Sequence, residues 1–392
     1  MQTQDHGRNG EADRSEVCFL VRALAGGGAQ RDAVLLANGL AGQGLATTIA
    51  TLDAEGPLRG LVDSRVRLID LGRGKRRRLA LAAPAIARLL RWERPRVLVA
   101  SEASGNALAV AATRLVPPAE RPRLVLREVA SPLAARRHDP HWQNRLGYLV
   151  APFVYARADL VVTVSEGARA ELVARFGQDP ARVVNLGTNA VLTDLDRPAP
   201  CTREPGLVVN VARLSPEKDH ETLLLAFASL LRTHPARLVI VGGGRERKRI
   251  GETIALLGLS DRVTLAGFLA DPAPLVARAA LFVSASRYEG LGNALIEAMA
   301  LGVPVVATDA PHGPREILLG GRLGALVPVG DAEALADAMA AALDAPLPAQ
   351  VLRARAADFT VERAALRFAG LLRERGLLPP PLARPHPESV DG

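Results

Sequence analysis

The chain has 392 residues, of which 48% are hydrophobic and 23% charged. Its length is sufficient for two domains of about 100 to 200 residues, each with its own hydrophobic core. Its two cysteines, Cys18 and Cys201, lie far apart, which excludes a disulfide framework and a cysteine-based metal site and makes a reducing cytoplasm the expected compartment. The formal net charge of +8 would admit a nucleic-acid partner, but the aromatic content of 3% and the lack of a recognition motif argue against that class.

The first half of the sequence alternates strand-like and helical runs. Residues 1–15 are polar and mixed in charge, so we expect a disordered tail without a secretory signal. The alternation that follows is typical of a parallel βαβ sheet and predicts a first domain over residues 16–192. The expected elements are Val17–Val21, Gln30–Gly42, Thr47–Thr51, Leu79–Arg91, Val97–Ala100, Ala107–Val116, Leu124–Arg127 and Leu160–Val164.

The whole excess of positive charge belongs to this half. Residues 1–200 hold 28 basic and 20 acidic side chains, whereas residues 201–392 hold 21 of each. Much of the excess lies in Arg73–Arg96, where the run Lys75–Arg78 precedes several leucines and Trp92. This pattern predicts a basic loop followed by an amphipathic helix. The apolar side of that helix could equally pack on its own domain. No stretch of the chain reaches the roughly 18 to 20 apolar residues needed to cross a bilayer.

A proline-rich, polar interval at residues 193–205 predicts a linker, after which the alternation starts again. We expect a second domain over residues 206–359, a last helix at 360–375, and a disordered tail at 378–392. Asp194 and Asp196 follow no strand, so we interpret them as a linker turn and expect no metal site. The elements expected in the second domain are Leu207–Val211, His220–Arg232, Arg237–Val241, Arg245–Leu257, Val263–Leu265, Leu275–Arg278, Leu281–Ser284, Asn293–Leu301, Val303–Thr308 and Ala332–Leu343.

The segment from Phe282 to Thr308 carries the most information about function. It sets Glu289 and Glu297 around a glycine-rich turn between a predicted strand and a predicted helix. The free backbone N–H groups of Leu291–Asn293 would then lie at a helix N-terminus and face an anion. Both carboxylates can accept hydrogen bonds from sugar hydroxyls. The segment therefore predicts a site for a phosphorylated sugar.

Arg213 and Lys218 follow the first strand of the second domain. Ligands of doubly wound sheets bind at the carboxyl ends of the strands. A fixed pair of cations at this edge would stabilise the charge on a departing diphosphate without a metal. A solvated surface pair is the alternative interpretation.

Two glycine-rich loops are candidate nucleotide contacts. Gly26–Gly28 follows the first strand and precedes a helix, so its amides form an anion-binding helix start or a purely structural tight turn. Gly242–Gly244 also ends a strand, but Arg247 stands where a dinucleotide fingerprint requires its third glycine. Close approach of a nucleotide therefore fits this loop better than NAD binding.

The two glutamates with seven residues between them resemble the signature of retaining glycosyltransferases of family 4, which have the two-domain GT-B fold. That fold consists of two doubly wound Rossmann-like α/β domains facing each other across a cleft. The resemblance extends over about 300 residues and rests on several short segments in order. These are Gly26–Arg31, Val164–Gly167, Asn189, Val211–Asp219, Val241–Gly244, Ala266–Phe268, Glu289–Glu297 and Gly313–Ile317.

The resemblance implies transfer of a hexose or N-acetylhexosamine from a nucleoside diphosphate, with UDP expected, to a saccharide hydroxyl with retention of configuration. It implies no metal and no cofactor, and a last helix that packs back on the first domain. Arg213 and Lys218 would hold the diphosphate, Glu297 the ribose, and Glu289 with the 291–293 amides the sugar. The remaining donor contacts would come from Gly27, Gly28, Gly243, Gly267, Phe268, Gly290, Leu291, Gly292 and Asn293.

On the acceptor side the sequence departs from the family pattern. Many relatives carry a histidine that assists catalysis where this chain has Arg127 and Glu128. These two residues are the acceptor-side candidates, and the sequence leaves open whether they substitute for that histidine. Family members with a basic, apolar patch act on lipid-linked acceptors. We therefore expect the segment Lys75–Trp92 to bind the anionic inner face of the cytoplasmic membrane.

The alternative functions are those of a sugar-nucleotide epimerase or a phosphorylase on the same fold. Such an enzyme needs its own acid/base set or a cofactor lysine, and among Lys75, Lys218 and Lys248 we see no candidate for the lysine.

Overall fold

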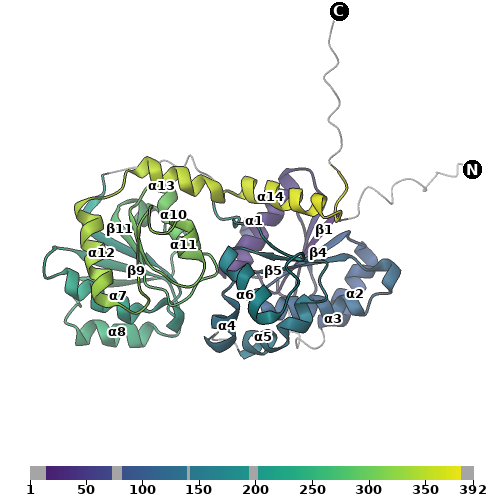
Figure 1. Cartoon of the computed structure of the whole chain (residues 1–392), viewed down its shortest axis with the longest axis horizontal. Helices are drawn as coiled ribbons and strands as arrows, with labels where there is room; N and C mark the ends of the chain where they lie inside the picture. The colour runs from purple at the N-terminus through teal and green to yellow at the C-terminus, as the bar shows by residue number, and fades with distance from the viewer. Residues whose placement is uncertain (1–14, 73–81, 139–141, 194–201, 381–392) are drawn as a thin grey trace, which may run out of the picture.

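A computed structural model describes residues 15–72, 82–138, 142–193 and 202–380. It contains two α/β domains that lie side by side along the long axis of the molecule (Figure 1). Most of both predicted tails, the basic run Lys75–Arg78 and most of the predicted linker lie outside the described residues. The predicted fold class is confirmed, since each domain is built on a parallel sheet with helices on both faces.

The first sheet has seven parallel strands in the order β3-β2-β1-β4-β5-β6-β7. Central strands such as β1 and β6 are short apolar runs and are buried along their whole length, as expected when helices cover both faces of a parallel sheet. The strands are β1 Val17–Val21, β2 Thr47–Thr51, β3 Arg67–Asp70, β4 Val97–Ser101, β5 Arg123–Glu128, β6 Leu160–Thr163 and β7 Val183–Asn185.

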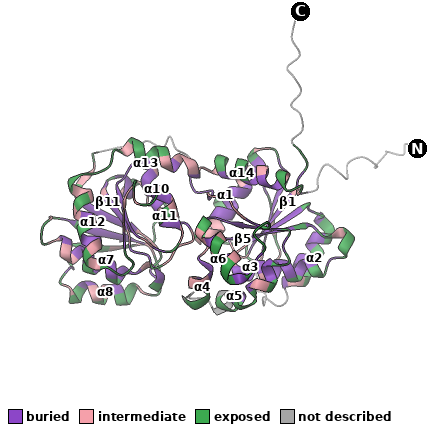
Figure 2. Cartoon of the chain, viewed as in Figure 1, coloured by how far each residue is buried: buried purple, intermediate pink, exposed green. Residues whose placement is uncertain are grey.

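Helices cover both faces of this sheet. Helix α1, together with the last helix of the chain, α14, forms a core on one face, and α2, α3, α5 and α6 form a second core on the other face. Figure 2 shows buried residues concentrated on the strands and on the helix sides that face them. The helices are α1 Gly28–Gly42, η1 Arg59–Leu61, α2 Ala82–Glu93, α3 Ala103–Arg114, η3 Pro118–Glu120, α4 Pro132–His138, α5 Trp142–Tyr155 and α6 Glu166–Phe176.

The second sheet has six parallel strands in the order β10-β9-β8-β11-β12-β13. Its first strand begins at Glu204, which lies inside the segment predicted as linker. The strands are β8 Glu204–Val211, β9 Arg237–Val241, β10 Val263–Gly267, β11 Ala279–Ser284, β12 Val305–Thr308 and β13 Ala325–Val327. The helices are η4 Pro216–Lys218, α7 His220–Leu230, α8 Arg247–Leu256, α9 Ala273–Ala277, α10 Asn293–Ala300, α11 Gly313–Ile317, α12 Ala332–Asp344, α13 Ala349–Ala356, η5 Ala357–Phe359 and α14 Val361–Glu374.

Helix α14 crosses from the second domain back to the first and packs on α1 (Figure 1). Thr360 caps it by accepting a hydrogen bond from the amide of Arg363. The rings of Phe19 and Phe368 have their centroids 6.4 Å apart. Gly39 of α1 permits the close approach, because a Cβ there would lie 2.7 Å from the Cβ of Ala365.

Helix α2 differs from the expectation of a lipid-facing amphipathic helix. Its apolar side chains Ile86, Leu89 and Leu90 are buried in the core of the first domain, while Trp92 is exposed. Those leucines therefore pack on the protein itself, which was the alternative interpretation of this segment. Helices α4 and α5 were not predicted at all. Within the described part of the chain, no helix is both long and apolar enough to cross a membrane.

Candidate active site

The two sheets each have a point where the strand order reverses, between β1 and β4 in the first and between β8 and β11 in the second. Loops that leave the carboxyl ends of strands at such points form ligand sites in doubly wound folds. Here loops from both points line one cleft of about 580 Å³. The sequence-predicted residues that line it are Gly27, Gly28, Arg213, Lys218, Glu289, Gly290, Leu291, Gly292 and Asn293.

The glycine loop after β1 forms one wall of this cleft. Gly26 has a φ of +96°, a conformation that favours glycine, and Gly27 is the N-cap of α1. The Gly27 amide donates to Oε1 of Gln30 at 3.4 Å. The loop thus places small residues and a helix start against the cleft, as the sequence predicted.

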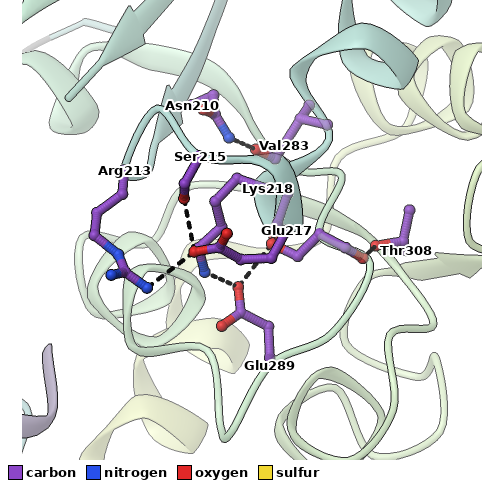
Figure 3. A network of polar contacts seen from close by, with 10 residues as sticks. Asn210, Arg213, Ser215, Glu217, Lys218, Val283, Glu289 and Thr308 are labelled. Atoms are coloured by element: carbon purple, nitrogen blue, oxygen red, sulfur yellow. Dashed lines mark hydrogen bonds and ion pairs between the residues drawn. The ribbon is translucent and has the colours of Figure 1, made fainter. Parts of the chain in front are cut away.

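Lys218 and Glu289 form an ion pair in the opposite wall, with Lys218 Nζ 2.5 Å from Glu289 Oε1 (Figure 3). Ser286 donates from Oγ to the same oxygen at 2.7 Å. The Lys218 side chain is 16% exposed and the Glu289 side chain 15%, so both reach the cleft but are mostly shielded from bulk water. Thr308 donates to the carbonyl of Ser286 at 2.6 Å and holds the loop in place.

Arg213 lies beside this pair and contacts Glu217 rather than Glu289 (Figure 3). The distance from its Nη2 to Glu217 Oε1 is 2.9 Å, and Ser215 donates to the same carboxylate oxygen at 2.6 Å. The Arg213 side chain is 61% exposed, whereas Glu217 is buried. The guanidinium is therefore anchored at one end and free to meet a ligand in the cleft with its other N–H groups.

Helix α10 begins at Asn293 with Gly292 as its N-cap, as predicted. Gly292 has a φ of +107°, and a Cβ on Gly290 would lie 1.9 Å from the carbonyl oxygen of Val129 in the first domain. The two domains therefore meet backbone to backbone at this loop. Asn189 of the first domain also donates to the Asn293 side chain, at 3.1 Å.

Glu297 lies one turn into α10 and does not line the main cleft. It forms an ion pair across the domain interface with Arg31 of α1, at 3.0 Å. Desolvation raises the pKa of the Glu297 carboxyl, and Arg31 opposes that shift. A ligand that bound this carboxylate would have to displace Arg31 from it.

The residues predicted to border the base lie beside each other at the edge of the second sheet. A Cβ on Gly243 would be 4.0 Å from the Cβ of Phe268, and Gly267 has a φ of +76°. Phe268 is exposed, so its ring is available for stacking. These three residues are not part of the cleft lining described above.

Arg127 and Glu128, the acceptor-side candidates, are not part of the cleft lining. Both side chains are fully buried at the end of β5, where Arg127 contacts α1 on one face of the sheet and Glu128 contacts α5 on the other. Arg127 Nη1 lies 2.6 Å from Asp32 of α1. Glu128 accepts hydrogen bonds from Tyr155 and, at 2.9 Å, from Tyr148. Neither residue reaches the cleft, so neither can touch an acceptor in this structure.

The structure adds residues that sequence reasoning left unassigned, including Ser286, Glu217 and Tyr148. Glu217 stands next to Lys218 in the sequence, and Ser286 stands three positions before Glu289, so proximity to a predicted residue was the available signal. Tyr148 lies on α5 and gave no signal. Among the residues that the structure describes, no group of three or more His, Cys, Asp or Glu side chains could hold a metal ion.

Comparison with protein families assigns each domain separately. Residues 27–187 match the family described as glycosyl transferase 4-like domain, and residues 195–359 match glycosyl transferases group 1. A solved structure of the Anabaena protein HepE, in complex with UDP and glucose, superposes with a TM-score of 0.74 at 21% identity and covers 92% of this chain and 100% of that one. That likeness concerns the fold.

Two curated relatives are similar over about half of the chain. One is the Campylobacter jejuni N-acetylgalactosamine-N,N'-diacetylbacillosaminyl-diphospho-undecaprenol 4-alpha-N-acetylgalactosaminyltransferase, 31% identical over 213 residues, which are 53% of this chain and 56% of the relative. The other is the lipopolysaccharide core biosynthesis glycosyltransferase LpsE of Rhizobium meliloti, 34% identical over 204 residues, 50% of this chain and 57% of the relative. This chain therefore spans just over half the length of either relative. The two facing Rossmann-like domains show the GT-B fold, and the families that the two domains match are both described as glycosyl transferases.

Proposed function

We propose that this protein transfers a hexose or N-acetylhexosamine from a UDP-sugar to a hydroxyl of a lipid-linked saccharide, with retention of the anomeric configuration. The observation that carries the proposal is the Lys218–Glu289 pair beside Arg213 and the start of α10, at the cleft between the two sheets. A cationic pair, a carboxylate and free amides are the groups that a diphosphate-linked sugar requires.

In this proposal the cations act on the leaving group. Negative charge grows on the diphosphate as the bond from the anomeric carbon to the phosphate oxygen breaks. Lys218 and Arg213 hold that charge more strongly in the transition state than in the ground state, which lowers the barrier. We assign no metal and no other cofactor to this step.

The new bond forms between the acceptor oxygen and the anomeric carbon on the face that the diphosphate leaves. The hydroxyl proton passes to the leaving phosphate oxygen, so the step needs no protein base. Glu289 orients the sugar through its hydroxyl groups, and Glu297 binds the ribose in place of its contact with Arg31. Gly243, Gly267 and Phe268 border the base, and approach of the two domains excludes water.

The names of the two relatives support the choice of acceptor. One name contains a saccharide linked to diphospho-undecaprenol, and the other assigns a role in lipopolysaccharide core biosynthesis. We extend that acceptor class to this chain and place the reaction at the inner face of the cytoplasmic membrane.

The donor is tested by thermal shift with UDP, GDP and ADP, followed by product analysis with the matching nucleotide sugars. A nucleotide at about 100 times its dissociation constant stabilises the folded protein by roughly 2.7 kcal/mol, which is easily measured. We expect the largest shift with UDP. Equal small shifts with all three nucleotides would contradict the donor assignment, and products with inverted configuration would contradict retention.

A further inference from the structure

Helix α5 exposes a row of large apolar side chains in the first domain. Leu146, Leu149, Val150 and Phe153 are 51%, 53%, 42% and 67% exposed. Their spacing of three, four and seven residues places them on one face of the helix. Residues on the opposite side, among them Tyr148, Ala151 and Tyr155, are buried in the core. The helix is thus apolar on both sides, and only one side is covered by the described chain.

This row differs from the other exposed apolar residues of the described chain. Single exposed residues such as Trp92, Leu256 and Leu366 lie on three separate helices, and scattered residues of that kind are normal. A contiguous apolar face indicates an interaction surface. Figure 2 shows that α5 lies at the lower edge of the first domain, away from α14 and both termini.

Four arginines lie on or next to the same pair of helices. Arg145 and Arg157 lie near the two ends of α5, and Arg136 and Arg137 lie on α4, which packs against α5. All four are exposed. Between Pro132 and Arg157 the sequence contains these four basic residues and a single acidic one, Asp139. An apolar helix face with a basic border is the pattern of helices that lie in the interface of an anionic bilayer.

We propose that the α4–α5 surface, defined by the four apolar residues of α5 and these four arginines, docks the protein on an anionic lipid bilayer. The apolar side chains would enter the boundary between headgroups and acyl chains, and the arginines would contact the anionic headgroups. This surface takes the place that the sequence suggested for Lys75–Trp92, whose described helix has its apolar side in the core.

The same two helices also reach the cleft. Tyr148 of α5, Ser131 just before α4, and Ala135 of α4 line it. A docked protein would therefore hold the cleft close to the headgroup layer, where the saccharide of a lipid-linked acceptor lies. This part of the inference rests on the proposed function, whereas docking itself does not.

Flotation with vesicles tests the surface directly. The test variant is Leu149→Ser with Phe153→Ser, and the matched control is Leu256→Ser with Leu366→Ser, which changes two exposed apolar residues on other helices. On vesicles of phosphatidylcholine and phosphatidylglycerol, we expect the test variant to partition about tenfold or more weakly than wild type and the control to match wild type. Arg136→Gln with Arg137→Gln should lower binding by about tenfold as well, and only where the vesicles contain phosphatidylglycerol and the salt is low.

Several results would overturn the proposal. Vesicle binding that survives both double variants but is lost when Lys75–Arg78 are replaced by Ser would return docking to the predicted basic segment. A dimer in sedimentation analysis that Leu149→Ser with Phe153→Ser dissociates would show that a second copy covers the face.

Failure of docking and failure of the proposed function are distinguishable. Vesicle binding is measured without donor, and UDP binding is measured without vesicles. The apolar double variant should keep wild-type UDP affinity and wild-type transfer to a water-soluble saccharide acceptor. If transfer to the soluble acceptor fell as much as vesicle binding, the α4–α5 surface would be needed for catalysis in the cleft and not for membrane docking.

Discussion

Lys218 and Glu289 are 71 positions apart in the sequence, and the fold joins them in an ion pair of 2.5 Å inside the cleft. The lysine comes from η4 after β8, and the carboxylate comes from the loop after β11, the neighbouring strand. Without a ligand each charge satisfies the other. A diphosphate sugar would enter between them, with its phosphates on the lysine and its hydroxyls on the glutamate.

The first prediction concerns the two cations. Lys218→Ala and Arg213→Ala each remove a contact that strengthens as the diphosphate leaves, so turnover should fall by about 100-fold or more. Lys248→Ala and Arg232→Ala change exposed side chains of the same domain and serve as controls. Turnover with the identified donor is the measurement, and circular dichroism checks the fold. Near-wild-type turnover in both site variants would refute the diphosphate assignment.

The second prediction separates the two carboxylates. Glu297→Gln should weaken UDP binding by roughly 1.5 to 3 kcal/mol, the value of a hydrogen bond to a charged group, whereas Glu289→Gln should impair transfer and leave UDP affinity nearly unchanged. Isothermal titration with UDP and with the UDP-sugar measures both. Arg31→Gln is the control, because it breaks the Arg31–Glu297 pair and keeps the carboxylate. Equal loss of UDP affinity in Glu289→Gln and Glu297→Gln would contradict the division of roles.

The third prediction concerns the contact between the domains. Gly290→Ala would place a Cβ 1.9 Å from the backbone of Val129, so the domains could not approach as they do here. We expect UDP affinity to stay near wild type, since Arg213, Lys218 and Glu297 all lie in the second domain, and turnover to fall by about 100-fold through misplacement of the reacting groups. Small-angle scattering should show a larger radius of gyration.

Gly251→Ala in α8 is the matched control, because a Cβ there meets nothing within 4 Å. It should leave turnover unchanged and stabilise the helix by about 0.5 to 1 kcal/mol. Full activity of Gly290→Ala would show that this contact is not needed for catalysis.

The fourth prediction concerns Glu128 and pH. Burial raises the pKa of its carboxyl from 4.5 to about 7, and the hydrogen bonds from Tyr155, the Ala130 amide and Tyr148 oppose the shift only in part. Between pH 4.5 and about pH 7, Glu128 of the folded protein keeps a proton that the same carboxyl of the unfolded chain has released. The stability that this group contributes is therefore fully present below about pH 4.5 and is lost as the pH rises through 7.

Glu128→Gln should remove that pH dependence. The difference in unfolding free energy between wild type and Glu128→Gln should change by on the order of 3 kcal/mol, to the disadvantage of wild type, from pH 4.5 to pH 8. One pKa unit corresponds to about 1.4 kcal/mol. Glu333→Gln, which changes an exposed glutamate of α12, is the control. Parallel pH profiles of wild type and Glu128→Gln would refute the raised pKa.

The architecture, and the meeting of most of the predicted site residues in one cleft, follow from the sequence alone. Short apolar runs that alternate with helical segments allow only a parallel sheet covered on both faces, and each sheet was confirmed. Residues next to strand ends were also predictable, because parallel strands bring their carboxyl ends to one edge. Lys218, Glu289 and the start of α10 were therefore expected at the carboxyl edge of the second sheet, and their side chains and backbone do line one cleft there.

The direction in which side chains point, and what covers them, depend on packing between distant elements. Arg127 and Glu128 end a strand as the donor residues do, yet both turn into the core, because α1 and α5 offer them Asp32 and two tyrosines. The rows Ile86–Leu90 of α2 and Leu146–Phe153 of α5 both carry apolar residues at helical spacing, but Leu89 and Leu90 are buried whereas Leu146 and Leu149 are exposed. Local periodicity fixes which face of a helix is apolar, and only the packing of distant elements decides whether that face is covered.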